Sequence, residues 1–463
     1  MSTEQKNASD LCYATENGSK TLSVEEIAAA DAYCEPYKAF LDTAKTEREA
    51  VSAAVAMAKE RGFRPFDHKA PLRAGDKVYV NNRGKALILA VIGEKPPEEG
   101  VSIAVAHIDS PRLDLKPNPL YEDSELAYFD THYYGGIKKY QWTAIPLALH
   151  GVVVKKNGET VTVRIGEEST DPLFCVTDLL PHLGGEQMKR SAAEVVKGED
   201  LNLLIGSRAL RDEEGDNPVK LQILKLLNEK YGITEADFLS AELEIVPAFG
   251  ARDVGFDRSM IGAYGHDDRV CAYPALTALF ENPHPAYTAI TLPADKEEIG
   301  SEGSTGMQSA FLQYFIEDLA AAAGTAARHV LSRSVCLSAD VNAAYDPIYP
   351  EVMVKSNSCL FNHGVCIMKY SGARGKSGTN DASAEWVAQV RRLLDDSGVL
   401  WQMGELGKVD AGGGGTVAKY VGNLGVDTVD LGVPVLSMHS PFEVVSKIDV
   451  YMAHKAFSAL FAR

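Results

Sequence analysis

The chain has 463 residues, of which 45% are hydrophobic and 24% are charged, the composition of an ordinary soluble globular protein. This length is enough for two or three domains with sizeable cores. The 64 acidic side chains outnumber the 46 basic ones, and the resulting net charge of -18 argues against nucleic acid as a partner.

No stretch of the sequence predicts a membrane span or an export signal. A run of about 18 apolar residues does not occur, and the segment Met1 to Lys20 is polar and lacks the apolar core of a secretion signal. The seven cysteines form no Cys-x-x-Cys pair and are odd in number, which indicates reduced and mostly buried thiols. We therefore expect a cytoplasmic protein without a membrane partner.

The first part of the chain is expected to combine helices with short strands. The expected elements are a helix capped by Ser23 and Glu26, a second helix between Pro36 and Gly62, a hairpin formed by residues 77–80 and 85–92, and a buried strand over residues 101–106. That last strand leads directly into His107.

From about Pro111 the pattern changes to β-structure and then returns to alternating strands and helices. The expected elements are strands over 145–154 and 161–165, a helix over 219–231, a strand over 288–292, a helix over 307–323, a strand over 330–337, and helices over 380–394 and 445–461. This order predicts an α/β sheet domain that is interrupted by a mostly β insertion. We expect a catalytic domain formed by residues 1–110 and 246–463, with the insertion at 111–245.

Histidine and carboxylate side chains recur in short segments, several of which follow an expected strand. These segments are 106–109 (AHID), 265–268 (GHDD), 295–300 (DKEEIG), 338–340 (SAD) and 437–440 (SMHS). Ligands bind at the carboxyl ends of strands in open α/β sheets, so these distant segments could converge. Mixed imidazole and carboxylate ligands suit zinc, manganese or cobalt and need no thiolate.

Taken singly, each of these signals has an ordinary structural explanation. The doublet Glu297-Glu298 could be a solvated turn, His107 a satisfied core histidine, and Asp267-Asp268 a helix cap. A pair of cations, however, needs a bridging carboxylate and a second carboxylate that takes a proton from the attacking water. Because adjacent glutamates point in different directions, one glutamate of the doublet could face a metal ion and the other the attacking water. The joint occurrence of the five segments therefore favours a metal site.

Three longer segments carry a family resemblance. They are AHIDSPRLDLKPNP at 106–119, DKEEIGSEGSTG at 295–306 and PVLSMHSPFE at 434–443. As a set, they make the chain resemble the aspartyl aminopeptidase family of co-catalytic zinc exopeptidases, in its shorter bacterial branch, from about Phe40 to the C-terminus. The resemblance implies a phosphorylase/hydrolase-like mixed-sheet catalytic domain, an insertion that makes subunit contacts (a dimerisation domain), and homo-oligomers as large as dodecamers built from dimers.

The resemblance also implies a role for each residue of the site. One divalent ion, in this family zinc, would be bound by His107, Asp267 and Asp340. The second would be bound by His439, Asp267 and Glu298, so that Asp267 bridges the pair. Glu297 would be the general base, and Asp109 would fix the tautomer of His107.

Substrate-binding residues are also implied. Lys369 occupies the position at which the family places a cation for an acidic N-terminal side chain. His132 and the glycine run 412–415 are expected to shape the pocket or its contact with a neighbouring subunit.

These features predict a metallo-aminopeptidase that removes single residues from short peptides with a free N-terminus, with a preference for Asp or Glu at that end. Two alternatives are open. Another two-metal amide hydrolase, such as a deacylase or a desuccinylase, would act on acylated amines instead. A non-catalytic peptidase-like assembly protein is disfavoured because the expected ligands and Glu297 are all present.

Overall fold

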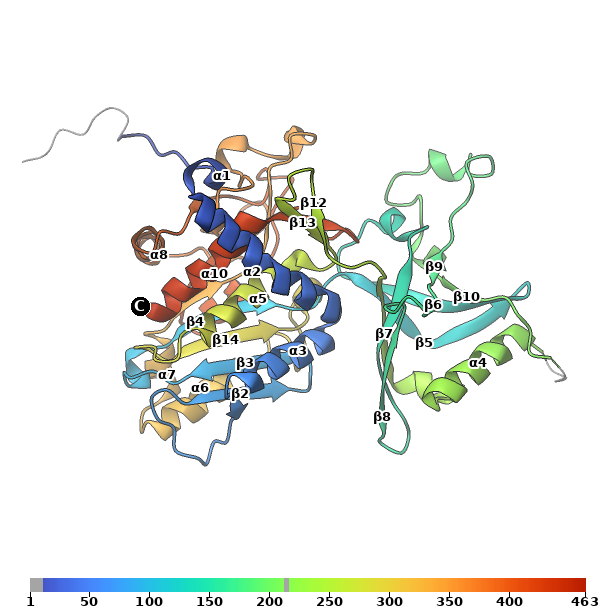
Figure 1. The fold of residues 1–463 in the computed structure, drawn as a ribbon, viewed down its shortest axis with the longest axis horizontal. Coiled ribbons are helices and arrows are strands. Elements are labelled where there is room, and N and C mark those ends of the chain that lie inside the picture. Colours follow the sequence, from blue (N-terminus) through green and yellow to red (C-terminus); the bar gives the residue numbers. More distant parts are fainter. Residues whose placement is uncertain (1–10, 212–215) are drawn as a thin grey trace, which may run out of the picture.

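The computed structural model describes residues 11–211 and 216–463, which form three β-sheets with helices packed against them (Figure 1). The first ten residues of the polar segment Met1 to Lys20 lie outside the described residues. Within the described part of the chain, no helix is both long enough and apolar enough to cross a membrane.

The largest sheet has nine strands in the order β1-β2-β3-β14-β4-β15-β19-β17-β18. The four central strands β14, β4, β15 and β19 are parallel, and β3 and β17 flank them in the antiparallel direction. The strands are β1 (Arg64–Pro65), β2 (Lys77–Asn82), β3 (Ala86–Val91), β4 (Ser102–His107), β14 (Ala289–Ala294), β15 (Val335–Ser338), β17 (Val365–Met368), β18 (Trp401–Met403) and β19 (Asp427–Gly432). The central strands are buried along most of their length because both faces of the sheet are covered.

Helices cover both faces of this sheet. One apolar core lies beneath α2 (Val24–Thr43), α3 (Glu47–Glu60), α5 (His266–Phe280), α8 (Ala384–Asp396) and α10 (Lys447–Ala462). On the opposite face, a second core includes side chains of α6 (Phe311–Ala322), α7 (Ala327–Leu331) and α9 (Ala418–Gly422). The short helix α1 (Gly18–Thr21) precedes α2.

A second sheet of seven antiparallel strands has the order β8-β7-β11-β5-β6-β10-β9. Its strands are β5 (Arg112–Asp123), β6 (Leu126–Tyr134), β7 (Leu147–Val154), β8 (Thr160–Ile165), β9 (Cys175–Val176), β10 (Leu203–Gly206) and β11 (Ala241–Pro247). It has its own apolar core, against which α4 (Pro218–Tyr231) packs, and it stands beside the nine-stranded part in Figure 1. In sequence it lies between β4 and β14, which are neighbours in the large sheet.

A third sheet was not expected from the sequence. It consists of β12 (Arg252–Val254), β13 (Met260–Ala263), β21 (Glu443–Ser446), β20 (Pro434–Leu436) and β16 (Asn342–Ala343), in that order. Strands β20 and β21 are antiparallel neighbours, so the connection between them, which carries His439, is held at both ends.

Most of the expected elements are present with shifted ends. The capping box of Ser23 and Glu26 and the hairpin of β2 and β3 are confirmed. The helix boundary expected at Pro36 is wrong, because α2 continues through this proline and buries side chains beyond it. The strand expected over 330–337 is wrong in its first half, where α7 ends, and the helix expected from 445 begins at Lys447 after β21. In these places, tertiary packing outweighs the local signal.

Candidate metal centre

The five histidine and carboxylate segments meet at the carboxyl edge of the nine-stranded sheet. His107 is the last residue of β4, Glu297 and Glu298 follow β14 in a short 3₁₀ helix, and Asp340 follows β15. Asp267 lies in the first turn of α5, and the peptide bond after it is cis. Because β4, β14 and β15 are parallel neighbours, their ends bring these side chains to one edge.

The carboxylate of Asp267 lies between two imidazole rings. Its Oδ1 is 3.0 Å from Nε2 of His107, and its Oδ2 is 3.1 Å from Nε2 of His439. The backbone of Asp267 is fixed as well, since its N–H donates to Glu443 and its carbonyl accepts from the hydroxyl of Ser110. One carboxylate thus faces two histidines that are far apart in sequence.

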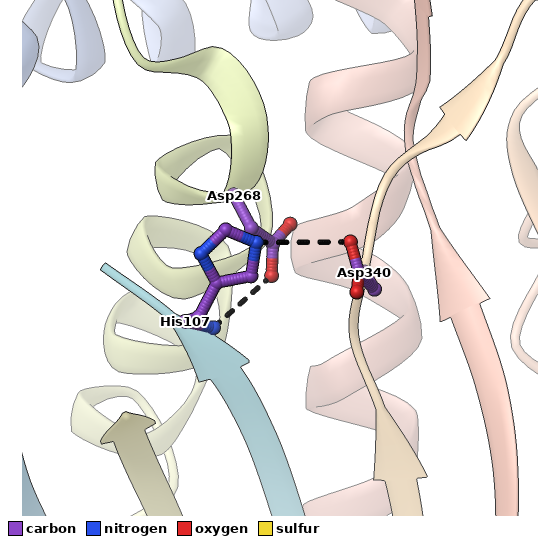
Figure 2. Close-up of side chains that lie close together, drawn as sticks. All are labelled: His107, Asp268 and Asp340. Atoms are coloured by element: carbon purple, nitrogen blue, oxygen red, sulfur yellow. Dashed lines mark hydrogen bonds and ion pairs between the residues drawn. The ribbon is translucent and has the colours of Figure 1, made fainter. Parts of the chain in front are cut away.

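The ring of His107 is buried among carboxyl groups. Figure 2 shows it beside Asp268 and Asp340, side chains that come from three different elements. Its Nε2 is 3.8 Å from Oδ1 of Asp340, and its backbone N–H donates to Asp268. Its Nδ1 is 3.0 Å from the backbone carbonyl of Asp109, nearer than the 3.4 Å to the Asp109 carboxylate. The backbone carbonyl therefore orients this ring more directly than the carboxylate predicted for that role.

His439 is oriented in a similar way from the other side. Its Nδ1 is 2.8 Å from the backbone carbonyl of Gly136, and its backbone N–H donates to Glu443. Its Nε2 is 3.5 Å from Oε1 of Glu298, in addition to its contact with Asp267. The φ angle of 65° at His439 is uncommon for a residue other than glycine, and such strain is often found at functional sites.

These contacts match a divalent cation well. Since a carbonyl oxygen can only accept, Nδ1 must be the donor in both histidines, which aims Nε2 of each ring at carboxylate oxygens. The neighbouring carboxylates raise the pKa of His107 well above its usual value, and that of His439 to about 11, although burial alone would lower both. A bound cation would take the place of the second proton on each ring.

The side chains that could bind a metal ion form overlapping groups. Three groups present ligand atoms within 4.8 Å of one another: His107 with Asp268 and Asp340, His107 with Glu297 and Glu298, and Asp267 with Glu298 and His439. The last group is the set predicted for the second ion. In addition, Oε1 of Glu298 is buried without a hydrogen-bond partner, as a ligand atom for a cation would be.

Glu297 and Glu298 are held by their backbone. Their N–H groups donate to the two carboxylate oxygens of Asp109, at 3.1 and 3.2 Å. Burial raises the pKa of Glu297 to about 8, with a further contribution from Asp340, and raises that of Glu298 well above its usual value. Asp109 thus positions the glutamate doublet as well as the adjoining histidine.

The seven-stranded sheet reaches the same site from the end of β6. The hydroxyl of Tyr134 donates to Asp109 at 2.8 Å, and Gly136 supplies the carbonyl that accepts from His439. A Cβ atom at Gly135 would lie 3.3 Å from Glu298, and one at Gly136 would lie 3.3 Å from His439. Because Gly135 and Gly136 have no side chains, the backbone can pass close to Glu298 and His439.

A cavity of about 570 Å³ opens beside these residues. Asp267, Glu297, Glu298, Asp340 and His439 line it, together with the glycines 413–415 that were expected to shape the pocket. The two predicted substrate-binding residues do not line it. Lys369 pairs with Asp381, and His132 lies on β6 with its ring stacked on Tyr133.

Sequence reasoning gave no site role to Asp268 or Glu443. Asp268 is fully buried beside His107, and burial raises its pKa well above the usual value. Glu443 accepts the backbone N–H groups of both Asp267 and His439. The signal for Asp268 was its place beside Asp267 in a carboxylate doublet, whereas Glu443 is the last residue of the PVLSMHSPFE segment. By contrast, His266, which precedes Asp267 in the GHDD segment, is a neutral core histidine hydrogen-bonded to Tyr37 and Ile261, and burial lowers its pKa to about 3.

Comparison with known proteins shows the family of the chain. The sequence profile of a family described as aminopeptidase I zinc metalloprotease (M18) matches residues 40–461. The chain belongs to the M18 family. A probable M18 family aminopeptidase 1 from Clostridium acetobutylicum is 52% identical to it over 431 residues, which are 91% of this chain and 93% of that relative. The chain is thus an M18 aminopeptidase, a zinc metallo-exopeptidase that hydrolyses peptide bonds.

Solved structures show the same mixed α/β fold. The crystal structure of an M18 family aminopeptidase from Thermotoga maritima matches with a TM-score of 0.93 and 45% identity, over 97% of this M18 aminopeptidase and 99% of that chain. The mApe1 dodecamer of Saccharomyces cerevisiae matches with a TM-score of 0.76 over 94% of this chain and 97% of its own, but at 21% identity this similarity shows the fold alone.

Proposed function

We propose that this M18 aminopeptidase removes N-terminal residues with a pair of divalent ions that share Asp267. His107, Asp267 and Asp340 would hold one ion, and His439, Asp267 and Glu298 the other. The observation that supports this most strongly is the position of the Asp267 carboxylate, with one oxygen 3.0 Å from His107 and the other 3.1 Å from His439. Asp268, which is buried beside His107, is an additional candidate for the first ion.

The chemistry of the donors favours zinc, with manganese or cobalt as the other metals that would fit. The set combines imidazole nitrogens with carboxylate oxygens and contains no thiolate. When bound, the two ions supply Lewis acidity that activates water at neutral pH and polarises the scissile carbonyl.

The protein's own groups would then move the protons. Glu297 lines the cavity, and its backbone is fixed by Asp109, so its carboxylate can take a proton from the attacking water and return it to the leaving amine. Positive charge beside Glu297 would lower its raised pKa, which keeps more of the base ionised at neutral pH. The free amine of the substrate would bind an ion or a nearby carboxylate, which explains the restriction to N-terminal residues.

Family membership speaks against the two alternatives. A deacylase would act on acylated amines, and an assembly protein would retain no metal, whereas this chain is an M18 aminopeptidase with every expected ligand present. The test uses protein purified without chelator. We expect about two zinc ions per chain by mass spectrometry and turnover of Leu- or Glu-p-nitroanilide but not of N-acetylated analogues. Absence of metal, or activity on the acetylated amides alone, would contradict the proposal.

A preference for acidic N-terminal residues is part of the proposal and rests on the family resemblance. Lys369 was the residue predicted to supply the required cation, and His132 the residue predicted to shape the pocket or its neighbour contact. In the free chain, Lys369 is engaged by Asp381 and does not line the cavity. A role for either residue therefore requires a rearrangement or a neighbouring subunit.

We also propose that residues 111–245 form an insertion domain that makes subunit contacts, in a catalytic domain formed by 1–110 and 246–463. The segment between β9 and β10 exposes Leu179, Leu180, Leu183 and Met188, and apolar side chains gathered at a surface often mark an interface. A homo-oligomer, with the yeast dodecamer as the reference assembly, is expected by light scattering. Replacement of Leu183 and Met188 by Glu should shift the mass toward smaller species, and an unchanged mass would exclude this segment as a subunit contact.

Location in the cytoplasm is likewise a proposal, to be checked by fractionation.

A further inference from the structure

The cavity of the candidate metal centre has one basic side chain, other than His439, among its described lining residues. This residue is Lys419, on α9. Its neighbour Tyr420 donates a hydrogen bond to the carbonyl of Gly300, which directly follows the 3₁₀ helix of the glutamate doublet. Gln308 donates to the same carbonyl. Helix α9 is thereby fixed to the loop that carries Glu297, and the position of Lys419 is tied to that of the reacting groups.

The ammonium group of Lys419 has no carboxylate partner. In the described part of the chain, its nearest aromatic contact is the ring of Tyr420 at 5.6 Å, and no ion pair or hydrogen bond engages its Nζ. Two other lysines near the pocket differ in this respect. Lys369 and Lys376 both pair with Asp381. Lys419 is thus a half-buried cation that faces the cavity with its hydrogen-bonding capacity unused.

The charges of the cavity explain which ligand this cation would bind. Four carboxylates line it, those of Asp267, Glu297, Glu298 and Asp340. Two divalent ions at the proposed site would offset the charges of these lining carboxylates, which leaves Lys419 as a cation of the cavity wall without a carboxylate partner. A cavity with that balance attracts an anion, and a partly desolvated ammonium group gains most from a carboxylate that reaches it.

The walls of the cavity suit a side chain with a short apolar stem. Val341, Met368, Leu406 and Met438 line it, and the hydroxyl-bearing residues Ser371 and Thr416 lie among them. Methylene groups of a substrate would pack against the first set, whereas the hydroxyl of Thr416 already donates to Asp430.

From these observations we infer that Lys419 binds a carboxylate of the substrate and so determines specificity. This inference rests on the proposed function, because it places the carboxylate within the same cavity as the hydrolysed bond. Two sources of this carboxylate are chemically equivalent: the side chain of an N-terminal Asp or Glu, and the free C-terminus of a dipeptide. Lys419 acts in binding and carries no proton in the reaction.

The test compares matched substrates for wild type and Lys419→Gln. Glu- and Leu-p-nitroanilide differ in the side-chain carboxylate, and Leu-Gly and Leu-Gly-amide differ in the terminal one. We expect at least one of these two kcat/KM ratios to fall about tenfold or more, the size expected for a lost hydrogen bond between charged groups. The substrate pair whose kcat/KM ratio falls identifies the source of the carboxylate that Lys419 binds. Lys419→Arg should retain most of the preference, and Lys156→Gln, a change at an exposed residue in the turn between β7 and β8, should leave both ratios unchanged.

Several outcomes would overturn the inference. Unchanged ratios in Lys419→Gln would do so, as would a change that appears in Lys369→Gln instead. If wild type hydrolyses none of the amides, the proposed function fails separately. Lys419 is then tested by calorimetric binding of free L-glutamate and L-leucine to zinc-loaded protein. Glutamate affinity should fall about tenfold in Lys419→Gln while leucine affinity holds, and equal affinities in both proteins would overturn the inference.

Discussion

The nine-stranded sheet and the seven-stranded sheet contribute to the candidate metal centre in different ways. The first presents His107, the glutamate doublet and Asp340 from the ends of parallel strands. The second contributes no side chain to the proposed ligand set and reaches the site through the hydroxyl of Tyr134 and the carbonyl of Gly136. On the proposed ligand set, the nine-stranded sheet would carry the chemistry, whereas the seven-stranded sheet would orient the groups that carry it.

To orient these groups, the seven-stranded sheet must be held in a fixed position relative to the nine-stranded sheet. Arg112 at the start of β5 is buried and lies 3.3 Å from Glu47 of α3 and from Glu244 of β11. His150 of β7 is fully buried, 2.9 Å from Glu49 and 3.0 Å from Glu167. Removing one partner from such a buried pair leaves the other charge uncompensated, so these contacts hold the sheets in one arrangement.

The largest effect should follow from Asp267→Asn, in the part that carries the chemistry. An amide has one acceptor oxygen and one donor nitrogen, so it can no longer offer an anionic oxygen to each of two cations. We expect metal content to fall from about two ions per chain to one or fewer, and peptidase activity to fall below detection. Mass spectrometry and a p-nitroanilide assay check this, and a variant that keeps both ions and full activity would contradict the bridge.

Glu297→Gln should separate chemistry from metal binding. Loss of a general base costs about 10² to 10⁴ in rate, so we expect kcat to fall by roughly a thousandfold. Because Glu297 is proposed to lie outside the coordination shell, metal content and melting temperature should stay near wild type. Near-normal kcat would contradict the assignment, and loss of metal would instead make Glu297 a ligand.

Tyr134→Phe tests the orienting role of the seven-stranded sheet. The change removes the hydroxyl that donates to Asp109, and loss of such an indirect contact typically costs about 10- to 100-fold in metal affinity or activity. We expect a loss of activity of about tenfold, part of which excess zinc should restore. Tyr121→Phe is the matched control, since that hydroxyl contacts Asn202 within the same sheet. Equal effects of both changes would argue against a specific role.

His150→Gln should give the smallest effect on activity and a pH-dependent effect on stability. Burial alone would lower the pKa of His150, but the carboxylates of Glu167 and Glu49 raise it above its usual value. A raised folded-state pKa stabilises the protein fully below the unfolded value of about 6.5, and this contribution is lost as pH rises through the folded value.

Urea unfolding at pH 6.0 and at pH 9.0 measures this difference. We expect the substitution to cost about 1–3 kcal/mol at pH 6.0, in keeping with hydrogen bonds between charged groups, and less at pH 9.0. A difference between the two proteins that does not change with pH would show that the imidazole stays neutral.

Part of this arrangement could be predicted from the sequence. The ligand candidates lie in short segments after apolar strands, and the strands of the central sheet have a clear buried pattern, so His107, Asp340 and the glutamate doublet were identified by position and residue type. Strand ends at one edge of a sheet converge by geometry, so these segments could be expected to lie together, whereas the role of each residue was taken from the family resemblance.

Other parts depend on packing that sequence patterns do not encode. The contact of Gly136 with His439 uses a backbone carbonyl, a group that every residue has. Helix α2 continues through Pro36 because Tyr37, Phe40 and Leu41 beyond it are buried in the core. Lys369 and Lys419 are both basic residues near glycine-rich segments, and only the three-dimensional arrangement distinguishes the paired side chain from the free one.

The two histidines that face Asp267 come from β4 and from the connection between β20 and β21, near the end of the chain. During synthesis, a ribosome would therefore have to translate nearly the whole message before both imidazoles exist. On the proposed ligand set, a chain that ends before His439 would lack one of the two imidazoles that face Asp267, and we expect it to be inactive.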